Sequence, residues 1–371
     1  MALFEELTTM GHEQVVFCHD KATGLKAIIA IHDTTLGPAL GGCRMWDYKS
    51  EEDALRDVLR LSRGMTYKNA VSGLNLGGGK SVIIGDPKKL KSEAFFRTFG
   101  RFVNSLGGRY ITAEDVNIRV NDIETVGLET DFVAGTNSKS GGSGDPSPVT
   151  AWGVYHGIRA SVQYKLGKSS LKGVRIAVQG CGAVGSHLIE HLTHEGAKVF
   201  VADIDAEKVK ENVRLYGAEA ASLEDIHRLN VDVFAPCALG GFLDDRTIPE
   251  LKARVVAGAA NNQLLDESIH GNMLRERGIL YAPDYVINAG GVINVYQELA
   301  GYDAKVAKQR AANIYDTLIN IYKEADTKGI TTNQASGIIA EERIKAVRSM
   351  SPLRNTIGNQ NWTHNDLLRS R

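Results

Sequence analysis

The chain has 371 residues, 43% of them hydrophobic and 23% charged, and its formal net charge at pH 7 is -1. Two domains suit this length, and a charge so close to zero gives no reason to expect a nucleic acid or an anionic membrane as a partner. The four cysteines lack C-x-x-C spacing, and no apolar signal segment or run of about 18 apolar residues is present, so we expect a cytoplasmic protein without a metal, a disulfide framework or a membrane span.

The first part of the chain alternates between patterns typical of strands and of helices. We expect strands at 25–33, 81–86 and 109–115, and helices at 51–70 and 94–106. In the first of these helices Leu55, Val58 and Leu59 recur at helical spacing, and acidic residues occupy the first turn, where the helix dipole favours them. The stretch GPALGG at 37–42 predicts a tight loop.

The stretch NLGGGKSVIIGDP at 75–87 places glycines directly before Lys80. A phosphate-binding P-loop would need a glycine where Leu74 stands, and a helix after the lysine. The residues that follow Lys80 are β-branched and end in Gly-Asp-Pro, which predicts a strand and a turn instead. We therefore interpret the glycines at 77–79 as backbone that lies flat while Lys80 points at a small ligand.

A segment rich in glycine, serine and proline at 135–150 separates this part from the next. Such a composition predicts a connection between domains or a loop at a cleft. A helix is expected at 151–167, with Thr150 available as its N-cap.

Gly180, Gly182 and Gly185 form the pattern G-x-G-x-x-G between a predicted strand and a predicted helix. A second strand follows and ends at Asp203, about 20 residues after the first glycine. Together these features predict a dinucleotide site, in which the helix N-terminus receives the pyrophosphate. Asp203 can accept hydrogen bonds from ribose hydroxyls and would repel a 2′-phosphate, so NAD is favoured over NADP. The alternative is a doubly wound sheet that binds no nucleotide.

Further strands are expected at 231–240, 254–261 and 278–291, and helices after about residue 300. Asn261, Asn262 and Asn288 lie at the polar ends of the last two strands. Ligands of open α/β sheets bind beyond the carboxyl ends of strands, so these residues indicate a cleft. Each asparagine could instead be a turn residue, because asparagine tolerates the left-handed backbone conformation.

A second site is suggested by Lys68, Lys80, the glycine pair at 41 and 42, and Asp115 at a strand end. If they meet opposite the nucleotide, a lysine and two backbone N–H groups would bind a substrate carboxylate. The neighbouring cation and partial burial would favour the neutral amine of Lys80, which a general base needs, with Asp115 as its proton partner. The alternative is that both lysines are solvated surface charges.

Longer motifs resemble those of the glutamate/leucine/phenylalanine/valine dehydrogenases, which are NAD(P)-dependent amino acid oxidoreductases. These motifs are GPALGGCRMW, GMTYKNAVSGLNLGGGKSVIIGDP, RYITAEDV, GCGAVG, APCALG, AGAANNQL and APDYVINAGGVINV, within residues 10–345. The resemblance implies a two-domain α/β fold with a deep cleft: an N-terminal substrate-binding and oligomerisation domain at 1–135, rejoined by helices at about 331–371, and a Rossmann-type NAD-binding domain at 136–330. It also implies a homo-oligomer, either an octamer or a dimer.

The same resemblance implies roles for single residues. Lys80 would be the catalytic lysine, Asp115 would assist the collapse of a carbinolamine, and Lys68 would bind the substrate carboxylate with Gly41 and Gly42. The other residues implied to contact substrate are Leu40, Met65, Ala113, Asn288, Val292 and Val295. Those implied to hold NAD are Thr150, Gly180, Cys181, Gly182, Ala183, Val184, Gly185, Asp203, Ala238, Asn261 and Asn262.

The residues of the side-chain pocket bear on the choice of amino acid. Glutamate-specific members resemble GPYKGG where this chain reads GPALGG, and their lysine pairs with the second carboxylate of the substrate. Leu40 cannot, and burying that carboxylate unpaired would cost on the order of several kcal/mol. The motifs best match the leucine-specific members, so we expect oxidative deamination of L-leucine and of other branched-chain amino acids, since one methylene changes discrimination by roughly 1–3 kcal/mol.

Two alternatives stay open at this point. One is a family member that prefers phenylalanine, tryptophan or valine, and Ala134 and Cys43 stand where the leucine-type pattern has threonine. The other is a catalytically inactive NAD-sensing protein. Lys68, Lys80 and Asp115 argue against the second, because a sensor has no use for a general base.

Overall fold

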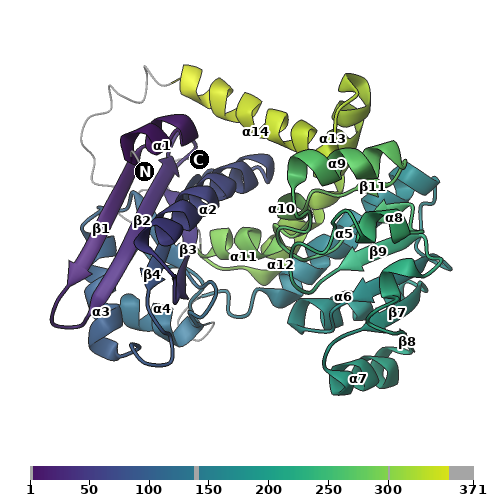
Figure 1. Cartoon of the computed structure of the whole chain (residues 1–371), viewed down its shortest axis with the longest axis horizontal. Coiled ribbons are helices and arrows are strands. Elements are labelled where there is room, and N and C mark those ends of the chain that lie inside the picture. Colours follow the sequence, from purple (N-terminus) through teal and green to yellow (C-terminus); the bar gives the residue numbers. More distant parts are fainter. Residues whose placement is uncertain (1–2, 138–141, 300, 351–371) are drawn as a thin grey trace. The chain divides into compact units, whose positions relative to one another are not determined.

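The computed structural model describes residues 3–137, 142–299 and 301–350, and they fold into two compact α/β units (Figure 1). The first unit comprises the described residues of Met1–Asp145, Val295–Asp303 and Ala340–Arg371, and the second comprises Pro146–Asn294 and Ala304–Ile339. No helix in the described ranges is long and apolar enough to cross a membrane. The predicted fold class, two α/β domains of which one is Rossmann-like, is confirmed.

The first unit is built on a mixed five-stranded sheet in the order β1-β2-β4-β3-β5. Its strands are β1 (Gln14–Asp20), β2 (Leu25–Asp33), β3 (Ala39–Trp46), β4 (Gly77–Ile84) and β5 (Tyr110–Ala113). The pairs β1–β2 and β2–β4 are antiparallel, whereas β3 runs parallel to both β4 and β5. The helices of this unit are α1 (Leu3–Met10), α2 (Glu51–Val71), α3 (Glu93–Asn104) and α4 (Val120–Val126).

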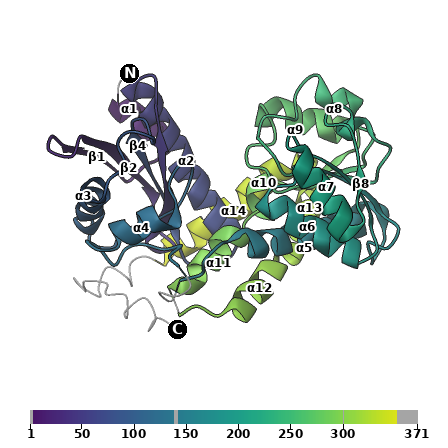
Figure 2. The same ribbon diagram turned by 90° about the horizontal axis from the view of Figure 1, so that it is seen from below.

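Both faces of this sheet are buried, which explains why β2 reads as a continuous apolar run. Ile29 and Ile31 belong to a core with Phe95 and Phe99 of α3. The alternate residues Ile28 and Ala30 of β2 belong to a second core with Val58 and Leu59 of α2. Helix α2 and helices α3 and α4 thus cover opposite faces (Figure 2).

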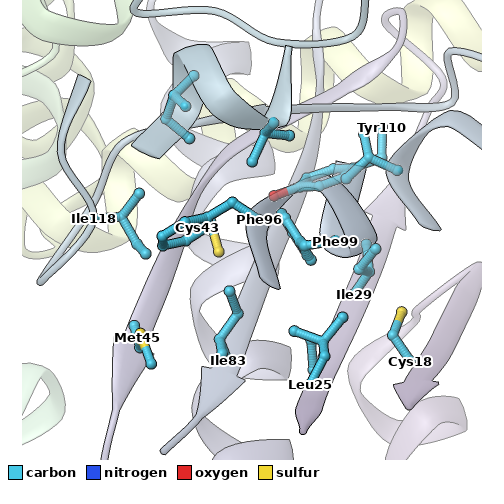
Figure 3. Close-up of a cluster of buried hydrophobic side chains, with 14 of the residues drawn as sticks. Cys18, Leu25, Ile29, Cys43, Met45, Ile83, Phe96, Phe99, Tyr110 and Ile118 are labelled. Carbon is cyan, nitrogen blue, oxygen red and sulfur yellow. The ribbon is translucent and has the colours of Figure 1, made fainter. Parts of the chain in front are cut away.

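Figure 3 shows the core on the α3 side, where Tyr110, Phe99 and Cys43 lie together. Burying a large apolar side chain of this kind contributes about 1.5–3 kcal/mol relative to leaving it exposed.

The loop predicted at 37–42 is confined to residues 37 and 38, because Ala39 to Gly42 begin β3. The reason is close packing between backbones: a Cβ on Gly41 would lie 1.8 Å from the carbonyl oxygen of Gly79. Glycine is needed at position 41 because two neighbouring strands approach closely there, and not because the backbone turns. Similarly, the strand predicted at 81–86 is confirmed but begins earlier, at Gly77.

The second unit carries a parallel six-stranded sheet in the order β11-β10-β9-β6-β7-β8. Its strands are β6 (Arg175–Gln179), β7 (Lys198–Ala202), β8 (Glu219–Ala220), β9 (Val233–Pro236), β10 (Val255–Val256) and β11 (Leu280–Tyr281). The direction of strand succession reverses between β6 and β9, and ligands of open α/β sheets bind at such a point.

The helices that complete the second unit lie before, between and after its strands along the chain. They are α5 (Ser147–Leu166), α6 (Ala183–His194), α7 (Ala206–Tyr216), η2 (Ile226–Arg228), α8 (Thr247–Glu250), α9 (Glu267–Glu276), α10 (Asp284–Ile287), α12 (Ala304–Ala312) and α13 (Ile314–Lys328). Two more, α11 (Gly290–Glu298) and α14 (Thr332–Ser349), begin in this unit and end in the first.

Two local expectations in this unit are wrong. The strand predicted at 278–291 is confined to Leu280–Tyr281, and α10 and α11 follow, with Asp284 in the first turn of α10, where the helix dipole favours an acidic side chain. Thr150 is not an N-cap either. It lies inside α5, where its Oγ1 donates to the carbonyl of Pro146 at 2.9 Å.

The last described helix ends against the first unit. Arg343 of α14 donates to the carbonyl of Ala70 at 2.8 Å, and Arg348 forms an ion pair with Asp33. The polar stretch 351–371 lies outside the described residues.

Candidate functional site

Lys80 lies on the face of β4 that is turned to helix α2. Successive residues of a strand point to opposite faces, and a Cβ on Gly78 would collide with Thr66 of α2 while Val82 packs in the α2 core. Lys80 stands between them. Its side chain is only 7% exposed, so the interpretation of Lys80 as a solvated surface charge does not hold.

Packing on the opposite face of β4 explains why residue 79 is a glycine. A Cβ on Gly79 would lie 2.7 Å from the ring of Tyr110, whose hydroxyl donates to the carbonyl of Gly41 at 2.7 Å and lies 2.9 Å from Ser81 Oγ. The glycines therefore let β4 pass between α2 and Tyr110 without side chains. This close packing fixes the strand that carries Lys80.

The structure brings Lys80 and Asp115 together. Lys80 Nζ lies 3.0 Å from Asp115 Oδ2, and Asp115 follows β5 with a side chain that is 24% exposed. The same oxygen accepts a hydrogen bond from Nε of Arg44, on β3, at 3.0 Å. Burial disfavours the ionised carboxylate, but the two cations outweigh it and lower the pKa of Asp115 below its ordinary value.

A second carboxyl next to this pair behaves in the opposite way. Burial and the neighbouring acids Asp145, Asp115 and Glu298 raise the pKa of Glu114. Two adjacent residues of the chain thus have carboxyl groups with pKa values shifted apart, an arrangement found where proton transfer is organised.

The predicted carboxylate-binding residues lie around this pair. Gly42 pairs in register with Ala113, and a Cβ on Gly42 would lie 2.9 Å from Cβ of Asp115. Met65 Cγ would lie 3.2 Å from a Cβ on Gly41. Lys68 is half-buried in the last turn of α2, three residues after Met65 and therefore on the same helix face.

The predicted pocket residues are divided between the two units. Leu40, at 2% exposure, and Ala113, at 7%, belong to the first unit together with Met65. Val295 also belongs there, and further along α11 Glu298 accepts hydrogen bonds from the backbone N–H groups of Gly135 at 3.0 Å and Ser143 at 2.7 Å. Asn288 and Val292 belong to the second unit.

The thiols are not reactive groups here. Burial raises the pKa of the Cys43 thiol to about 12, that of Cys181 to about 11 and that of Cys237 to about 12. The thiolate is the nucleophilic form, so these cysteines are inert near neutral pH. In the described parts of the chain no group of three His, Cys, Asp or Glu side chains is arranged to hold a metal ion.

The glycines of the second unit form a cradle at the reversal between β6 and β9. Gly180 has a φ of 111°, and a Cβ there would lie 2.8 Å from the carbonyl carbon of Cys237. A Cβ on Gly185 would lie 2.0 Å from the carbonyl oxygen of Gly180, so α6 can begin directly against β6. A Cβ on Gly182, the N-cap of α6, would meet nothing within 4 Å. The cradle is thus open at the helix N-terminus, where a pyrophosphate fits.

Asp203 ties this cradle to the end of β7. Its Oδ2 accepts a hydrogen bond from the backbone of Cys181 at 2.6 Å, and its Oδ1 accepts one from Asp205 at 2.8 Å. Each carboxylate oxygen can accept a further bond, so the residue still suits a ribose diol. Ala183 and Val184 begin α6, and Ala238 is exposed just after β9.

The three asparagines are not equivalent. Asn288 is 6% exposed and donates to the carbonyl of Ala259 at 3.1 Å and to Oδ1 of Asn261 at 2.6 Å. Its own Oδ1 is buried without a partner among the described residues. Asn262 has a φ of 51°, which is the left-handed conformation, so the alternative interpretation as a turn residue also fits this position.

Thr150, inside α5, packs against the start of α11, since a Cβ on Gly291 would be 3.1 Å from its Oγ1.

Sequence reasoning missed Arg44, Asp57 and Tyr48, which form one polar network with Asp115. Arg44 stands in the same motif as the glycine pair, but no spacing rule indicates that it meets a carboxylate 71 residues away. Glu114 was visible only as the second acid at a strand end.

The comparisons with known proteins agree with this geometry. A sequence model described as the dimerisation domain of Glu/Leu/Phe/Val dehydrogenases matches residues 12–137, and the companion model of the same dehydrogenases matches 141–209 and 202–351. The chain is 56% identical over 348 residues to a leucine dehydrogenase of Geobacillus stearothermophilus, which covers 94% of this chain and 95% of that protein. It is 53% identical to an L-tryptophan dehydrogenase of Nostoc punctiforme, over 93% of this chain and 96% of that protein.

A solved structure is also similar. The crystal structure of L-tryptophan dehydrogenase from Nostoc punctiforme superposes with a TM-score of 0.84 at 50% identity, over 93% of this chain and 99% of that one. With family models that match nearly the whole described chain, the protein belongs to the glutamate/leucine/phenylalanine/valine dehydrogenases and is an amino acid dehydrogenase.

Proposed function

We propose that the chain catalyses the reversible, NAD-dependent oxidative deamination of L-leucine and related branched-chain L-amino acids. In this reaction leucine, water and NAD give 4-methyl-2-oxopentanoate, ammonium and NADH. The observation that carries the proposal is the buried pair of Lys80 Nζ and Asp115 Oδ2, 3.0 Å apart beside the glycine pair of β3.

The second unit fits a nicotinamide dinucleotide. The open N-terminus of α6 at Gly182 and the position of Asp203 at the end of β7 supply the phosphate and ribose contacts that such a cofactor needs. The negative charge of Asp203 supports NAD over NADP. When bound, the nicotinamide ring supplies an acceptor for the hydride that leaves the substrate Cα.

The residues of the first unit would handle the protons. A bound amino acid carries an ammonium group, which must lose a proton before hydride can leave Cα. The lowered pKa of Asp115 keeps its carboxylate ionised, so that it is free to take up that proton transiently and to return it to the departing nitrogen. Lys80, in the neutral form that it takes after giving up its proton, would take a proton from the water that attacks the iminium carbon. Lys68 with Gly41 and Gly42 would hold the substrate carboxylate, so that proximity contributes to the rate.

The side-chain preference rests on Leu40. It is 2% exposed and offers no cation for a second substrate carboxylate, so glutamate is disfavoured. Met65, Ala113, Val292 and Val295 would complete an aliphatic pocket.

A second candidate is a preference for an aromatic amino acid. It is favoured by the likeness to the Nostoc punctiforme L-tryptophan dehydrogenase, which is almost as great as that to the leucine dehydrogenase. Initial rates at 340 nm with Leu, Ile, Val, Phe, Trp and Glu at saturating NAD decide between the two. We expect Leu, Ile and Val to give the highest kcat/KM; a faster rate with Phe or Trp would overturn the substrate assignment and leave the reaction class intact.

We also propose a homo-oligomer in the cytoplasm. The first part of the chain matches a domain whose description includes dimerisation, and the cysteines are free thiols, as in a reducing compartment. Light scattering of the purified chain measures the subunit number.

A further inference from the structure

Arg44 joins two carboxylates that come from different elements. Its Nε donates to Oδ2 of Asp115, after β5, at 3.0 Å, and its Nη1 donates to Oδ2 of Asp57, on α2, at 3.0 Å. The hydroxyl of Tyr48 donates to the same Asp57 oxygen at 2.7 Å. One guanidinium therefore connects the proposed proton partner to the helix that packs on this face of the sheet.

We propose that Arg44, anchored by Asp57, is a positioning residue that holds one oxygen of Asp115 and leaves the other open to the substrate nitrogen. The inference rests on the role of Asp115 in the proposed function. Both Lys80 Nζ and Arg44 Nε lie 3.0 Å from the same oxygen, Oδ2. The other oxygen of Asp115, Oδ1, accepts no hydrogen bond from the described residues. Since it is also absent from the buried polar atoms that lack a partner, and the side chain is 24% exposed, solvent reaches it.

The burial of the network explains why the residue is an arginine. The side chain of Arg44 is 23% exposed and that of Asp57 16%, so the ion pairs are only partly screened by water. A guanidinium is a planar fork that can direct separate N–H bonds to two carboxylates. An ammonium group at the same position is a point charge and cannot keep both orientations.

The electrostatic contribution of Arg44 can be separated from that of its neighbours. Among the described residues, the titratable and charged groups that interact electrostatically with Asp115 include Lys80, Arg44, Glu114, Cys43, Tyr48 and Tyr110. Burial raises the pKa of Cys43 to about 12 and also raises the pKa of Tyr48 and Tyr110, so these three stay neutral at working pH. Burial and nearby acids raise the pKa of Glu114. The cations Arg44 and Lys80 therefore favour the ionised carboxylate.

The test compares Arg44→Gln, Arg44→Lys and Asp57→Asn, with Arg56→Gln as the control. Arg56 also lies on α2, but it is 65% exposed and, among the described residues, forms an ion pair with Asp53 alone. Arg44→Gln removes one of two cations from Asp115, so the acid limb of the kcat/KM profile should move up by roughly one pH unit, and kcat should fall about tenfold or more. Arg44→Lys keeps the positive charge, so its acid limb should lie near that of the wild type, while its kcat should lie between those of Arg44→Gln and the wild type.

Asp57→Asn separates geometry from charge. The guanidinium remains and the amide oxygen can still accept its hydrogen bond, but the ion pair that anchors it is removed, so we expect a lower kcat without an upward shift of the acid limb. A purely structural role would lower the melting temperature of Arg44→Gln and leave the pH profile of the surviving enzyme unchanged. An unchanged pH profile of this kind would overturn the proposal. So would an Arg44→Gln variant whose kcat and acid limb equal those of the wild type. If Arg44→Gln does not fold, Arg44→Lys and Asp57→Asn carry the test.

A measurement without turnover distinguishes this inference from the proposed function. The carboxyl ¹³C signal of Asp115, assigned by its loss in Asp115→Asn, is titrated in the wild type and in Arg44→Gln. We expect the midpoint to rise when Arg44 is removed; an unchanged midpoint contradicts the positioning role. A wild-type chain that oxidises no amino acid would refute the proposed function but leave this titration valid.

Discussion

Lys80 on β4 and Asp115 after β5 form an ion pair with 3.0 Å between Nζ and Oδ2, and the side chain of Lys80 is only 7% exposed. If this pair moves the protons of the reaction, Lys80→Ala should lower kcat by roughly 10²–10⁴-fold with little change in far-UV circular dichroism. Lys89→Ala is the matched control, because Lys89 is 79% exposed. A near-native kcat in Lys80→Ala would mean that the base has been assigned wrongly.

Lys68→Ala should act on substrate binding more than on turnover. A hydrogen-bonded ion pair with a carboxylate contributes about 1.5–3 kcal/mol, so we expect KM for leucine to rise by at least tenfold, with a smaller effect on kcat. KM for NAD serves as the internal control, since Lys68 belongs to the first unit. A kcat that falls while KM stays constant would instead give Lys68 a role in the chemical step.

Gly78→Ala should destabilise the first unit. The added Cβ would lie 2.2 Å from the backbone nitrogen of Thr66 and 2.5 Å from the carbonyl oxygen of Ser62, neither of which can move without shifting α2. Overpacking of this kind costs about 1–3 kcal/mol or more. Gly64 lies on α2, and a Cβ added there would meet no atom within 4 Å. Gly64→Ala should therefore stabilise the protein by about 0.5–1 kcal/mol. Urea unfolding measures both, and equal midpoints would contradict the packing argument.

Asp203→Asn should improve the use of NADP relative to NAD. The amide can still accept the hydrogen bond from Cys181, so the cradle is kept, while the charge that repels a 2′-phosphate is removed. The measured quantity is the ratio of kcat/KM values for the two cofactors. Asp205→Asn removes a charge two residues away, at the N-cap of α7, and should leave that ratio unchanged. If both variants behave alike, the preference has another origin.

The stability of the protein should fall as the pH drops from about 6.5 towards 4, in part because of His12. Burial, together with the nearby His32, lowers the pKa of His12 from 6.5 to about 4. Between these values the unfolded chain binds a proton that the folded chain does not, so protonation favours unfolding. His12→Gln should therefore flatten the dependence of melting temperature on pH in this window. His19→Gln, at an exposed position, is the control, and equal slopes in all three proteins would refute the assignment.

Local patterns were enough for part of the molecule. Residues 175–203 form one strand-turn-helix-strand unit whose contacts are short in sequence, and the predicted strands and helix are found there. Helix α2 was also predictable, because its apolar spacing and its Ser50 cap are properties of a single segment. By contrast, GPALGG was assigned to a loop because glycine is typical of turns, and only the partner strand reveals that glycine is needed at Gly41 for close approach.

The amino-acid sequence by itself predicted the nucleotide-binding motif, the α/β character of both units and Lys80 as the candidate reactive lysine, because each prediction follows from residues close together in the chain. The tertiary structure alone decided that Arg44 and Asp57 support Asp115, and that Val295–Asp303 joins the first unit. The physical reason is that a side-chain network depends on which elements pack together, and that packing joins residues whose separation along the chain carries no periodic signal.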